Sequence, residues 1–219
     1  MRSPLSLGIL ISGSGTNLQA IIDAIEHDDL NAQIKIVISN RNDAYGLTRA
    51  QQHGLSTIVI PHKEFPSREA FEAAIIKALE AHGVELVILA GFMRLLSAFF
   101  IRAFPQRIMN IHPALLPAFP GTHAQRQALQ HGVRVAGATV HFVDEEVDHG
   151  PIIIQAAVPV YPDDSEESLS ARILSQEHRI YPRAIQLFAE GRLEIRDRVV
   201  ILHDEVRTPT ANLRSPEST

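Results

Sequence analysis

The sequence predicts an α/β fold: a mostly parallel, doubly wound sheet with helices on both faces and a mixed or antiparallel extension in the C-terminal half. Short runs rich in Ile, Val and Leu, without polar alternation, are typical of parallel strands buried on both faces. Helical patterns separate these runs in the first half, which indicates βαβ units. In the second half, two longer β-like runs follow each other with no helical pattern between them, which accounts for the predicted extension.

Five apolar runs predict the parallel strands, at Leu7–Ile11, Ile34–Ser39, Thr57–Ile60, Glu85–Ala90 and Ile108–Ile111. Two helices are expected between them, because apolar residues recur at i, i+3, i+4 and i+7 over Leu18–Ile25 and again over Phe71–Leu79. Ser67 is the predicted N-cap of the second helix, and Gly83 is its predicted stop.

The two longer runs of the second half are Ala136–Val143 and Pro151–Val160. The acidic segment Asp144–Gly150 joins them, as a hairpin loop or as a more open connection. A further β-prone segment follows at Leu193–Leu202.

A long helix is expected between the second of these runs and the final β-prone segment. The helical pattern starts near Asp164 and continues to Gly191. Glu167 follows Asp164 by three residues, which is the spacing of a capping box. Pro182 falls inside this pattern and is expected to bend or split the helix, because proline lacks the backbone N–H that an internal helix position donates.

Composition excludes several classes of function. The chain has 219 residues, 45% of them hydrophobic, a formal charge of −5 and no cysteine. The absence of cysteine excludes disulfides, thiolate metal sites and cysteine nucleophiles. The acidic balance disfavours a nucleic-acid partner. The apolar run Leu5–Ile11 is too short to span a membrane, so we expect a soluble, cytoplasmic protein without a membrane partner.

The first candidate motif is the segment Ser12–Asn17, between the first strand and the first helix. Its two glycines permit a tight turn, and the free N–H groups of a helix start favour an anion such as a phosphate. A turn without any ligand is the alternative. A dinucleotide motif requires a glycine where Leu18 stands, and a P-loop requires a lysine where Ser14 stands, so a monophosphate remains.

The second candidate is Asn110 with His112, at the end of the fifth predicted strand. Residues two apart on a strand share a face, and ligands of open α/β sheets bind beyond the carboxyl ends of the strands. A carboxamide and an imidazolium both donate hydrogen bonds that suit a developing oxyanion. The chain has 11 histidines, and a histidine chosen blindly belongs to the surface or the core edge more often than to a site. The strand-end position and the adjacent Asn110 distinguish His112 from the others.

The third candidate is the acidic segment Asp144–Pro151. A carboxylate from it near His112 favours the protonated imidazole; a solvated loop is the alternative. His141, Asp144, Asp148 and His149 are candidate metal ligands, but no H-E-x-x-H spacing is present and we expect no metal. The sequence also lacks the G-x-S-x-G motif of serine hydrolases, which favours direct transfer of an acyl group between two bound substrates.

Four segments together resemble the phosphoribosylglycinamide formyltransferase family: Ile11–Ala20, Leu89–Leu96, Asn110–Pro113 and Gln176–His178. The resemblance covers residues 5–195 in the same order. It implies an enzyme of purine biosynthesis, a formyltransferase with a Rossmann-like sheet. Such an enzyme transfers the formyl group of the co-substrate 10-formyltetrahydrofolate to the primary amine of glycinamide ribonucleotide, through a tetrahedral intermediate.

The resemblance also implies a domain organisation. We expect one formyltransferase domain over residues 1–206, with a nucleotide-binding half at about 1–105 and a folate-binding and catalytic half at about 106–206. Residues 207–219 form a polar, proline-containing tail that is expected to be disordered. A monomer or a homodimer is expected.

Residue roles follow from the resemblance by position. The catalytic residues are Asn110, His112 and Asp148. The residues that bind the phosphate and the nucleotide are Ser14, Gly15, Thr16, Asn17 and Glu177. The folate-binding residues are Arg68, Met93, Arg94, Leu95, Leu96, Asn110, Asp144, Glu145, Glu146, Val147 and Asp148. The sequence departs from the family at Thr16, where serine is common, and at His149, where glycine is common.

Related enzymes give the alternatives. Methionyl-tRNA formyltransferase carries an additional RNA-binding domain and a basic surface, and formyltetrahydrofolate deformylase, a hydrolase, carries an additional regulatory domain. We expect neither domain in a chain of this length. The alternative from another class is a non-catalytic module that binds a nucleotide or folate.

Overall fold

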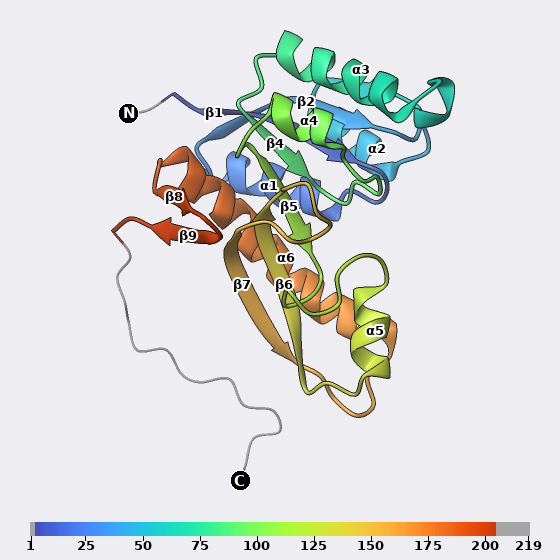
Figure 1. Cartoon of the computed structure of the whole chain (residues 1–219), viewed down its shortest axis with the longest axis vertical. Coiled ribbons are helices and arrows are strands. Elements are labelled where there is room, and N and C mark those ends of the chain that lie inside the picture. Colours follow the sequence, from blue (N-terminus) through green and yellow to red (C-terminus); the bar gives the residue numbers. More distant parts are fainter. Residues whose placement is uncertain (1–2, 205–219) are drawn as a thin grey trace.

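One sheet of nine strands organises the part of the chain that the computed structural model describes, residues 3–204 (Figure 1). The predicted tail at 207–219 lies outside the described residues. The strands are β1 (Leu5–Ile11), β2 (Ala32–Ser39), β3 (Thr57–Val59), β4 (Leu86–Leu89), β5 (Ile108–His112), β6 (Val135–Phe142), β7 (Ile152–Pro159), β8 (Leu193–Arg196) and β9 (Val199–Leu202). Their order across the sheet is β3-β2-β1-β4-β5-β6-β7-β9-β8.

The helices are α1 (Thr16–Glu26), α2 (Tyr45–Gln52), α3 (Arg68–Ala81), α4 (Ala98–Ala103), α5 (Ala124–Gln130) and α6 (Glu166–Ala189), with a short 3-10 turn at His62–Glu64. The sequence patterns found α1, α3 and α6. They missed α2, α4 and α5, because these helices have only 8, 6 and 7 residues, and so short a segment shows little of an apolar stripe.

The sheet changes direction at β5. Strands β1 to β5 are parallel, whereas β6 runs antiparallel to β5 and β7 runs antiparallel to β6. The predicted fold class, a mostly parallel sheet with an antiparallel extension, is therefore confirmed. The direction change has a consequence for the site, because the register of β5 and β6 pairs Asn110 with His141 and His112 with Thr139.

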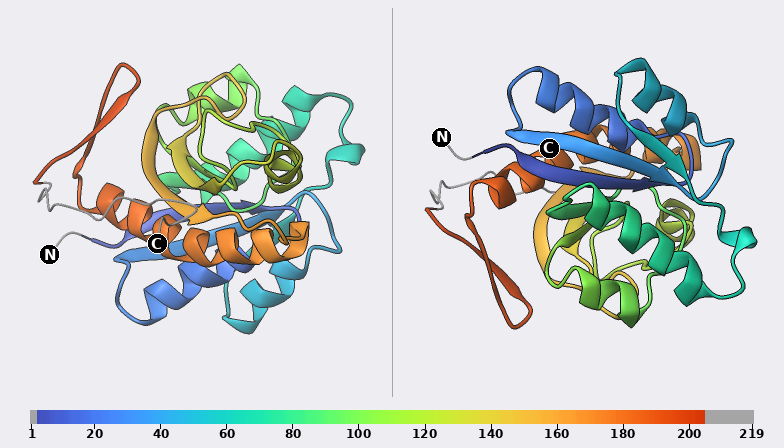
Figure 2. Two further views of the ribbon diagram at one scale, coloured as in Figure 1. Left: turned by 90° about the horizontal axis from the view of Figure 1, so that it is seen from below. Right: turned by 90° about the horizontal axis from the view of Figure 1, so that it is seen from above.

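The two faces of the sheet are covered by different helices. Helices α1, α2 and α6 pack on one face, and α3 and α4 pack on the other (Figure 2). The buried side chains of β1 alternate between the two cores: Ile9 and Ile11 contact the α1 side, whereas Leu10 contacts the α3 side. A third cluster lies under α5 and the first half of α6.

The ends of α3 are confirmed. The Ser67 side chain accepts a hydrogen bond from Ala70 N, and the helix stops at Ala81, followed by the C-cap His82 and by Gly83 in a left-handed conformation. The predicted capping box of α6 is wrong by one residue, since Ser165 and Ser168 form it.

Helix α6 continues through Pro182, so of the two predicted outcomes the split is wrong and the bend stays a prediction. Proline removes one helix hydrogen bond. The neighbouring residues compensate, because Tyr181 and Ile185 are fully buried in the core and the Tyr181 hydroxyl donates to the carbonyls of Leu89 and Met109, each at 3.0 Å. Across residues 3–204, none of the helices combines the length and apolar character needed to cross a membrane.

Candidate active site

The loop between β1 and α1 lies where the sequence predicts it, and glycine determines its shape. Gly15 has φ +71° and is the N-cap of α1. A Cβ atom at this position would approach Gly46 Cα to 2.5 Å, and Gly46 N donates to Gly13 O at 3.0 Å. The start of α2 therefore packs directly against the loop. The first N–H groups of α1, which have no partner within the helix, lie at the carboxyl end of β1.

Ser12 ties this loop to the segment after β4. Its hydroxyl donates to Asn40 Oδ1 at 2.6 Å and accepts from Met93 N at 2.8 Å. The segment 93–96, which the resemblance assigns to folate, is thereby fixed beside the predicted phosphate loop. Met93 and Leu95 are 71% and 63% exposed, while Leu96 packs against the core on the α3 side.

Asn17 and Glu177 meet across 160 positions of sequence. Asn17 Nδ2 donates to Glu177 Oε2 at 2.7 Å, and both residues are buried. Burial raises the pKa of the Glu177 carboxyl, and the hydrogen bond from Asn17 opposes that effect. Among the described residues, two buried side-chain atoms lack a hydrogen-bond partner: Asn17 Oδ1 and His178 Nε2. Buried polar atoms without partners are rare, so both atoms have free capacity to pair with a polar ligand or a water molecule.

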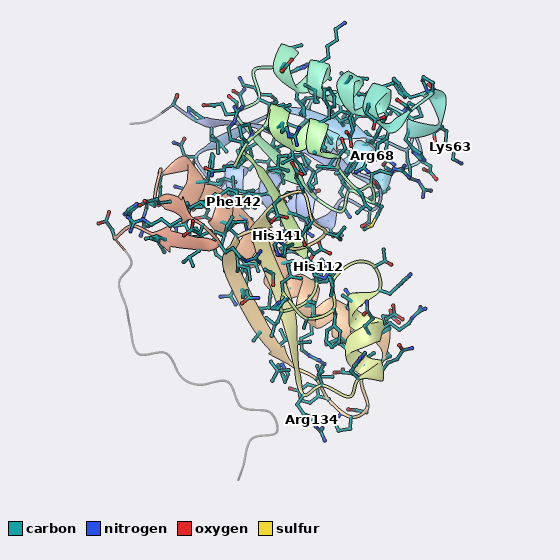
Figure 3. The ribbon with its side chains drawn as sticks, viewed as in Figure 1. Lys63, Arg68, His112, Arg134, His141 and Phe142 are labelled. Carbon is teal, nitrogen blue, oxygen red and sulfur yellow. The ribbon has the colours of Figure 1, made fainter. Side chains whose placement is uncertain are left out.

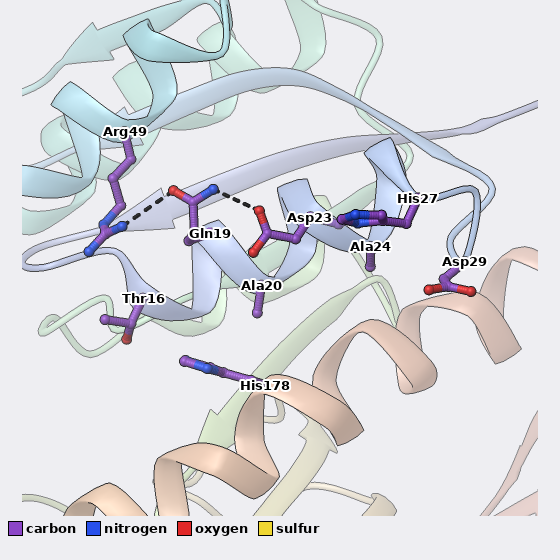
Figure 4. A pocket seen from close by; sticks show the side chains of 9 residues that line it. All are labelled: Thr16, Gln19, Ala20, Asp23, Ala24, His27, Asp29, Arg49 and His178. Atoms are coloured by element: carbon purple, nitrogen blue, oxygen red, sulfur yellow. Dashed lines mark hydrogen bonds between the residues drawn. The ribbon is translucent and has the colours of Figure 1, made fainter.

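A cavity of about 420 Å³ extends from this loop between α1 and α6. Thr16 and Arg49 are among its lining residues, and Figure 4 shows His178 reaching from α6 towards α1, with Arg49 at one end and Asp29 near the other. Arg49 Nε donates to Ser14 O at 2.9 Å, which places a positive charge beside the loop. Sequence reasoning missed Arg49, because no local pattern distinguishes it from other arginines on helices.

The second part of the site lies at the end of β5. His112 is 4% exposed; its Nδ1 lies 3.3 Å from Asp148 Oδ2, and its Nε2 lies 2.8 Å from Phe119 O. Asn110 Nδ2 lies 3.4 Å from Asp148 Oδ1. The structure therefore brings together the three residues, Asn110, His112 and Asp148, that the resemblance names as catalytic.

Asp148 is positioned by backbone from two loops. It lies in the connection between β6 and β7 with φ +51°, a conformation that non-glycine residues rarely adopt. Its Oδ2 accepts a hydrogen bond from Gly121 N at 2.7 Å, in the connection between β5 and α5. Because this carboxylate oxygen also faces His112, it fixes both loops against the end of β5.

His141 belongs to this cluster, although the sequence analysis considered it only as a metal ligand. Its Nδ1 lies 2.8 Å from Phe142 O and its Nε2 lies 3.2 Å from Asn110 Nδ2. The tautomer with hydrogen on Nδ1 satisfies both contacts. Burial lowers the pKa of His141, the effect of Asp148 opposes this and that of His112 adds to it, so the neutral form is favoured.

A sequence signal for His141 exists. Thr139 and His141 are polar residues two apart on an otherwise apolar strand, and Figure 3 shows His141 close to His112 in the centre of the molecule. The β5–β6 register explains this closeness. Thr139 is fully buried, and its hydroxyl donates to Ala114 O at 2.7 Å and accepts from Leu116 N at 3.0 Å. It thus anchors the chain directly after His112.

The remaining residues assigned to folate are distributed over three places. In the connection after β6, Val147 is 49% exposed, and Asp144 Oδ1 accepts from Glu146 N at 3.1 Å. Glu145 pairs with Arg102 of α4 at 3.3 Å. Arg94 is exposed in the segment after β4.

Arg68 is placed differently. It lies at the start of α3, and Figure 3 shows it in the upper part of the molecule, apart from His112 and His141. Its Nε pairs at 3.1 Å with the buried carboxylate of Glu72, which also accepts from Ser97 N at 2.8 Å. The structure does not bring Arg68 to the cluster of Asn110, His112 and Asp148. Among residues 3–204, no group of three or more His, Cys, Asp or Glu side chains is arranged to hold a metal ion.

Comparison with known proteins agrees with this geometry. The formyl transferase family model matches residues 6–185. Phosphoribosylglycinamide formyltransferase of Escherichia coli is 44% identical over 213 residues, which cover 97% of this chain and 100% of that protein. The trifunctional purine biosynthetic protein adenosine-3 of Drosophila melanogaster is 51% identical over 187 residues, which cover 84% of this chain and only 14% of that protein.

Among solved structures, glycinamide ribonucleotide transformylase 1 from Symbiobacterium toebii is 56% identical, with a TM-score of 0.92. The match covers 93% of this chain and 96% of that chain. Both the family match and the near full-length relatives include the loop after β1, the end of β5 and the β6–β7 connection. The chain therefore belongs to the formyl transferase family.

Proposed function

We propose that this chain transfers the formyl group of 10-formyltetrahydrofolate to the primary amine of glycinamide ribonucleotide, in purine biosynthesis. The observation that carries this proposal is the convergence of Asn110, His112 and Asp148 at the end of β5. A module that only binds a nucleotide or folate has no need of such a cluster. The names of its full-length relatives favour transfer to the ribonucleotide over the deformylase reaction.

The ribonucleotide phosphate binds at the start of α1. Backbone N–H groups of the loop, contributed by Ser14, Gly15, Thr16 and Asn17, donate to it, and the helix dipole favours its negative charge. The positive charge of Arg49 beside Ser14 O adds to this attraction. Glu177 and the unpartnered Asn17 Oδ1 accept hydrogen bonds from the polar groups of the same substrate.

The folate lies between the segment after β4 and the connection after β6. The exposed apolar side chains of Met93, Leu95 and Val147 offer surface to its aromatic ring system. The other residues in this role are Arg94, Leu96, Asn110, Asp144, Glu145, Glu146 and Asp148. Arg68 contacts the more distant part of the folate, in keeping with its separation from the catalytic cluster.

In the reaction, the substrate amine attacks the formyl carbon and the carbonyl oxygen becomes an oxyanion. The Asn110 carboxamide and His112 in its charged form donate hydrogen bonds to it. Both ring nitrogens of His112 face oxygen acceptors, an arrangement that the doubly protonated ring satisfies. The oxyanion takes the Nε2–H group in place of Phe119 O.

Collapse of the tetrahedral intermediate breaks the bond between the formyl carbon and the folate nitrogen. The amine proton must leave and the folate nitrogen must gain a proton. Asp148, which supports the charge on His112 at 3.3 Å, assists this transfer through water. The neutral His141 orients the Asn110 amide through its Nε2 atom.

The test supplies 10-formyltetrahydrofolate with and without glycinamide ribonucleotide and follows loss of the formyl group. We expect loss only with the ribonucleotide. Loss without it indicates deformylation, and no loss in either case indicates a binding module. In parallel, kcat of the His112→Ala variant is expected to fall by a factor on the order of 10²–10³. Near-normal turnover in that variant contradicts the proposed mechanism.

Three further predictions belong to this proposal. We propose one domain over residues 1–206 with a nucleotide-binding half and a folate-binding half. We also propose a cytoplasmic protein that acts as a monomer or homodimer, without a nucleic-acid or membrane partner. Light scattering tests the oligomeric state, and fractionation of cells tests the location and membrane association, both independently of the activity.

A further inference from the structure

The hairpin of β8 and β9 reaches the connection that carries Asp148. Its two-residue turn consists of Asp197 and Arg198, and β9 joins the sheet through a single residue pair, Ile152 with Val199, at the first residue of β7 (Figure 1). The connection between β6 and β7 ends just before that point. The turn is thus placed against the end of the segment 143–151.

Arg198 makes direct contacts with His149 in this segment. Its Nη2 donates to His149 O at 2.8 Å, and its Nη1 contacts the imidazole nitrogens Nδ1 and Nε2. The fork of the guanidinium group therefore engages both the backbone and the side chain of one residue. The single ammonium group of a lysine could not make both contacts in this geometry.

His149 transmits this contact to the start of the connection. Its Nδ1 lies 2.8 Å from Asp144 Oδ2, while Asp144 Oδ1 accepts from Glu146 N. The tautomer with hydrogen on Nδ1 donates to Asp144 and leaves Nε2 free to accept from Arg198. The side chains of Arg198, His149 and Asp144 are thus connected by consecutive hydrogen bonds that run from the hairpin to the start of the connection.

The backbone of the segment 143–151 is also constrained at Gly150, near its end. A Cβ atom at Gly150 would lie 1.9 Å from Phe142 O, so only glycine permits the close approach of the two ends of the connection. Asp148, with φ +51°, directly precedes His149 and lies two residues before this close approach. Its orientation therefore depends on the position of His149.

We propose that Arg198 and His149 are positioning residues, which fix the connection 143–151 so that the Asp148 carboxylate meets His112 and Gly121 N. This inference rests on the proposed function in one respect, that Asp148 takes part in formyl transfer. Asp144 and His149 are 36% and 39% exposed, so the contact is partly screened by solvent and its removal has a moderate effect.

The kinetic test compares Arg198→Ala with Arg196→Ala. Arg196 lies on the same hairpin but pairs with Glu194 at 2.7 Å, so it is a matched control. For Arg198→Ala we expect kcat to fall about threefold to tenfold, because Asp148 is misplaced by a fraction of an ångström. The KM for the ribonucleotide stays unchanged, as does every parameter of Arg196→Ala. His149→Ala is expected to match Arg198→Ala.

Hydrogen exchange of the backbone gives a readout that does not depend on activity. Gly121 N–H donates to Asp148, so its exchange reports where that carboxylate lies. We expect it to exchange at least about fivefold faster in Arg198→Ala than in Arg196→Ala. If only the amides of β8 and β9 exchange faster, Arg198 merely anchors the hairpin and the inference is wrong.

The two measurements separate the inference from the proposed function. If the wild-type chain transfers no formyl group, the proposed function fails, while faster exchange at Gly121 in Arg198→Ala still supports positioning. If the wild type transfers formyl groups and Arg198→Ala retains both full kcat and normal exchange at Gly121, the proposed function stands and the positioning role is excluded.

Discussion

In the N-terminal half, the candidate phosphate site comes mainly from one continuous loop, residues 12–17. In the C-terminal half, the reaction cluster comes from two strands and a loop, with Asn110, His112, His141 and Asp148 as its members. The first relies on backbone N–H groups, which every residue carries. The second requires particular side chains to meet at one point. A short segment can therefore specify the first site, while the second depends on the packing of distant segments.

The two halves also use unusual backbone conformations for different purposes. Gly15, with φ +71°, brings α1 and α2 close together and shapes a loop. Asp148, with φ +51°, aims a carboxylate at His112. Substitutions at Asn110, Gly15 and His141 test this contrast, and a fourth, at Asp164, tests a position outside both sites.

The largest expected effect is in the C-terminal half. Asn110→Ala removes one of the two proposed oxyanion donors, and kcat is expected to fall on the order of 10²–10³, because such a donor acts mainly in the transition state. Steady-state kinetics with both substrates measures it. The KM for the ribonucleotide should stay within about twofold, since the proposed phosphate site lies in the other half. A fall in kcat below about tenfold would falsify the oxyanion role.

The next prediction concerns the N-terminal half. Gly15→Ala introduces a Cβ atom at 2.5 Å from Gly46 Cα and strains the left-handed backbone by about 1–2 kcal/mol. The loop shifts, so the KM for the ribonucleotide should rise about tenfold while kcat changes little.

Gly54→Ala is the matched control, because Gly54 has φ +66° and open space around it. Both variants should lower the melting temperature, and only Gly15→Ala should raise the KM for the ribonucleotide. Equal KM values in the two variants would show that the loop does not bind the substrate.

The third prediction tests the positioning of Asn110 by His141. His141→Ala should lower kcat about threefold to tenfold, because the amide loses the acceptor that orients it. His141→Asn, whose side-chain oxygen accepts the same hydrogen bond, should restore part of the loss. Identical rates for the two variants would contradict the positioning role.

The lowered pKa of His141 also predicts that the free energy of unfolding depends on pH. Its pKa is lowered in the folded chain, so the unfolded chain binds a proton first as the pH falls below about 6.5. The stabilisation is complete above that value and is lost as the pH falls towards the folded pKa. Urea unfolding between pH 7 and pH 5 should show this loss in the wild type and a smaller loss in His141→Asn. Equal losses in the two proteins would contradict this prediction.

The smallest effect on catalysis is expected at the start of α6. The side chain of Asp164 is 4% exposed and pairs with both Nη atoms of Arg172, at 2.7 and 2.8 Å. Asp164→Asn should lower the free energy of unfolding by about 1–3 kcal/mol at pH 7 without changing kcat. Glu166→Gln, which removes the exposed pair with Arg126, should cost less than about 1 kcal/mol.

The sign of the pH dependence follows from the same ion pair. Arg172 lowers the pKa of Asp164 well below its ordinary value. The stabilisation is present above about pH 4, where an unfolded aspartate is ionised, and is lost as the pH falls further. The difference between wild type and Asp164→Asn should therefore shrink under acid conditions. A constant difference would indicate that packing rather than charge stabilises this helix start.

Several features of the fold were predictable because they depend on neighbouring residues. The cap at Ser67, the stop at Gly83 and the loop at 12–17 follow from side-chain and backbone preferences over a few positions. The same reasoning misplaced the capping box at Asp164. That side chain is engaged by Arg172, eight positions later and thus two turns along the helix, beyond the range of a capping rule.

The sequence by itself determined the alternation of strands and helices, the turn that exposes the start of α1, and the pairing of Asn110 with His112 on one face of β5. Tertiary structure alone decided that His141 Nε2 contacts Asn110 Nδ2, that Gly121 N meets Asp148 and that Arg198 contacts His149. The physical reason is the distance along the sequence over which each interaction acts. Capping, turns and periodicity act within a few residues, whereas these contacts depend on the antiparallel register of β5 with β6 and on the place where the β8–β9 hairpin joins the sheet.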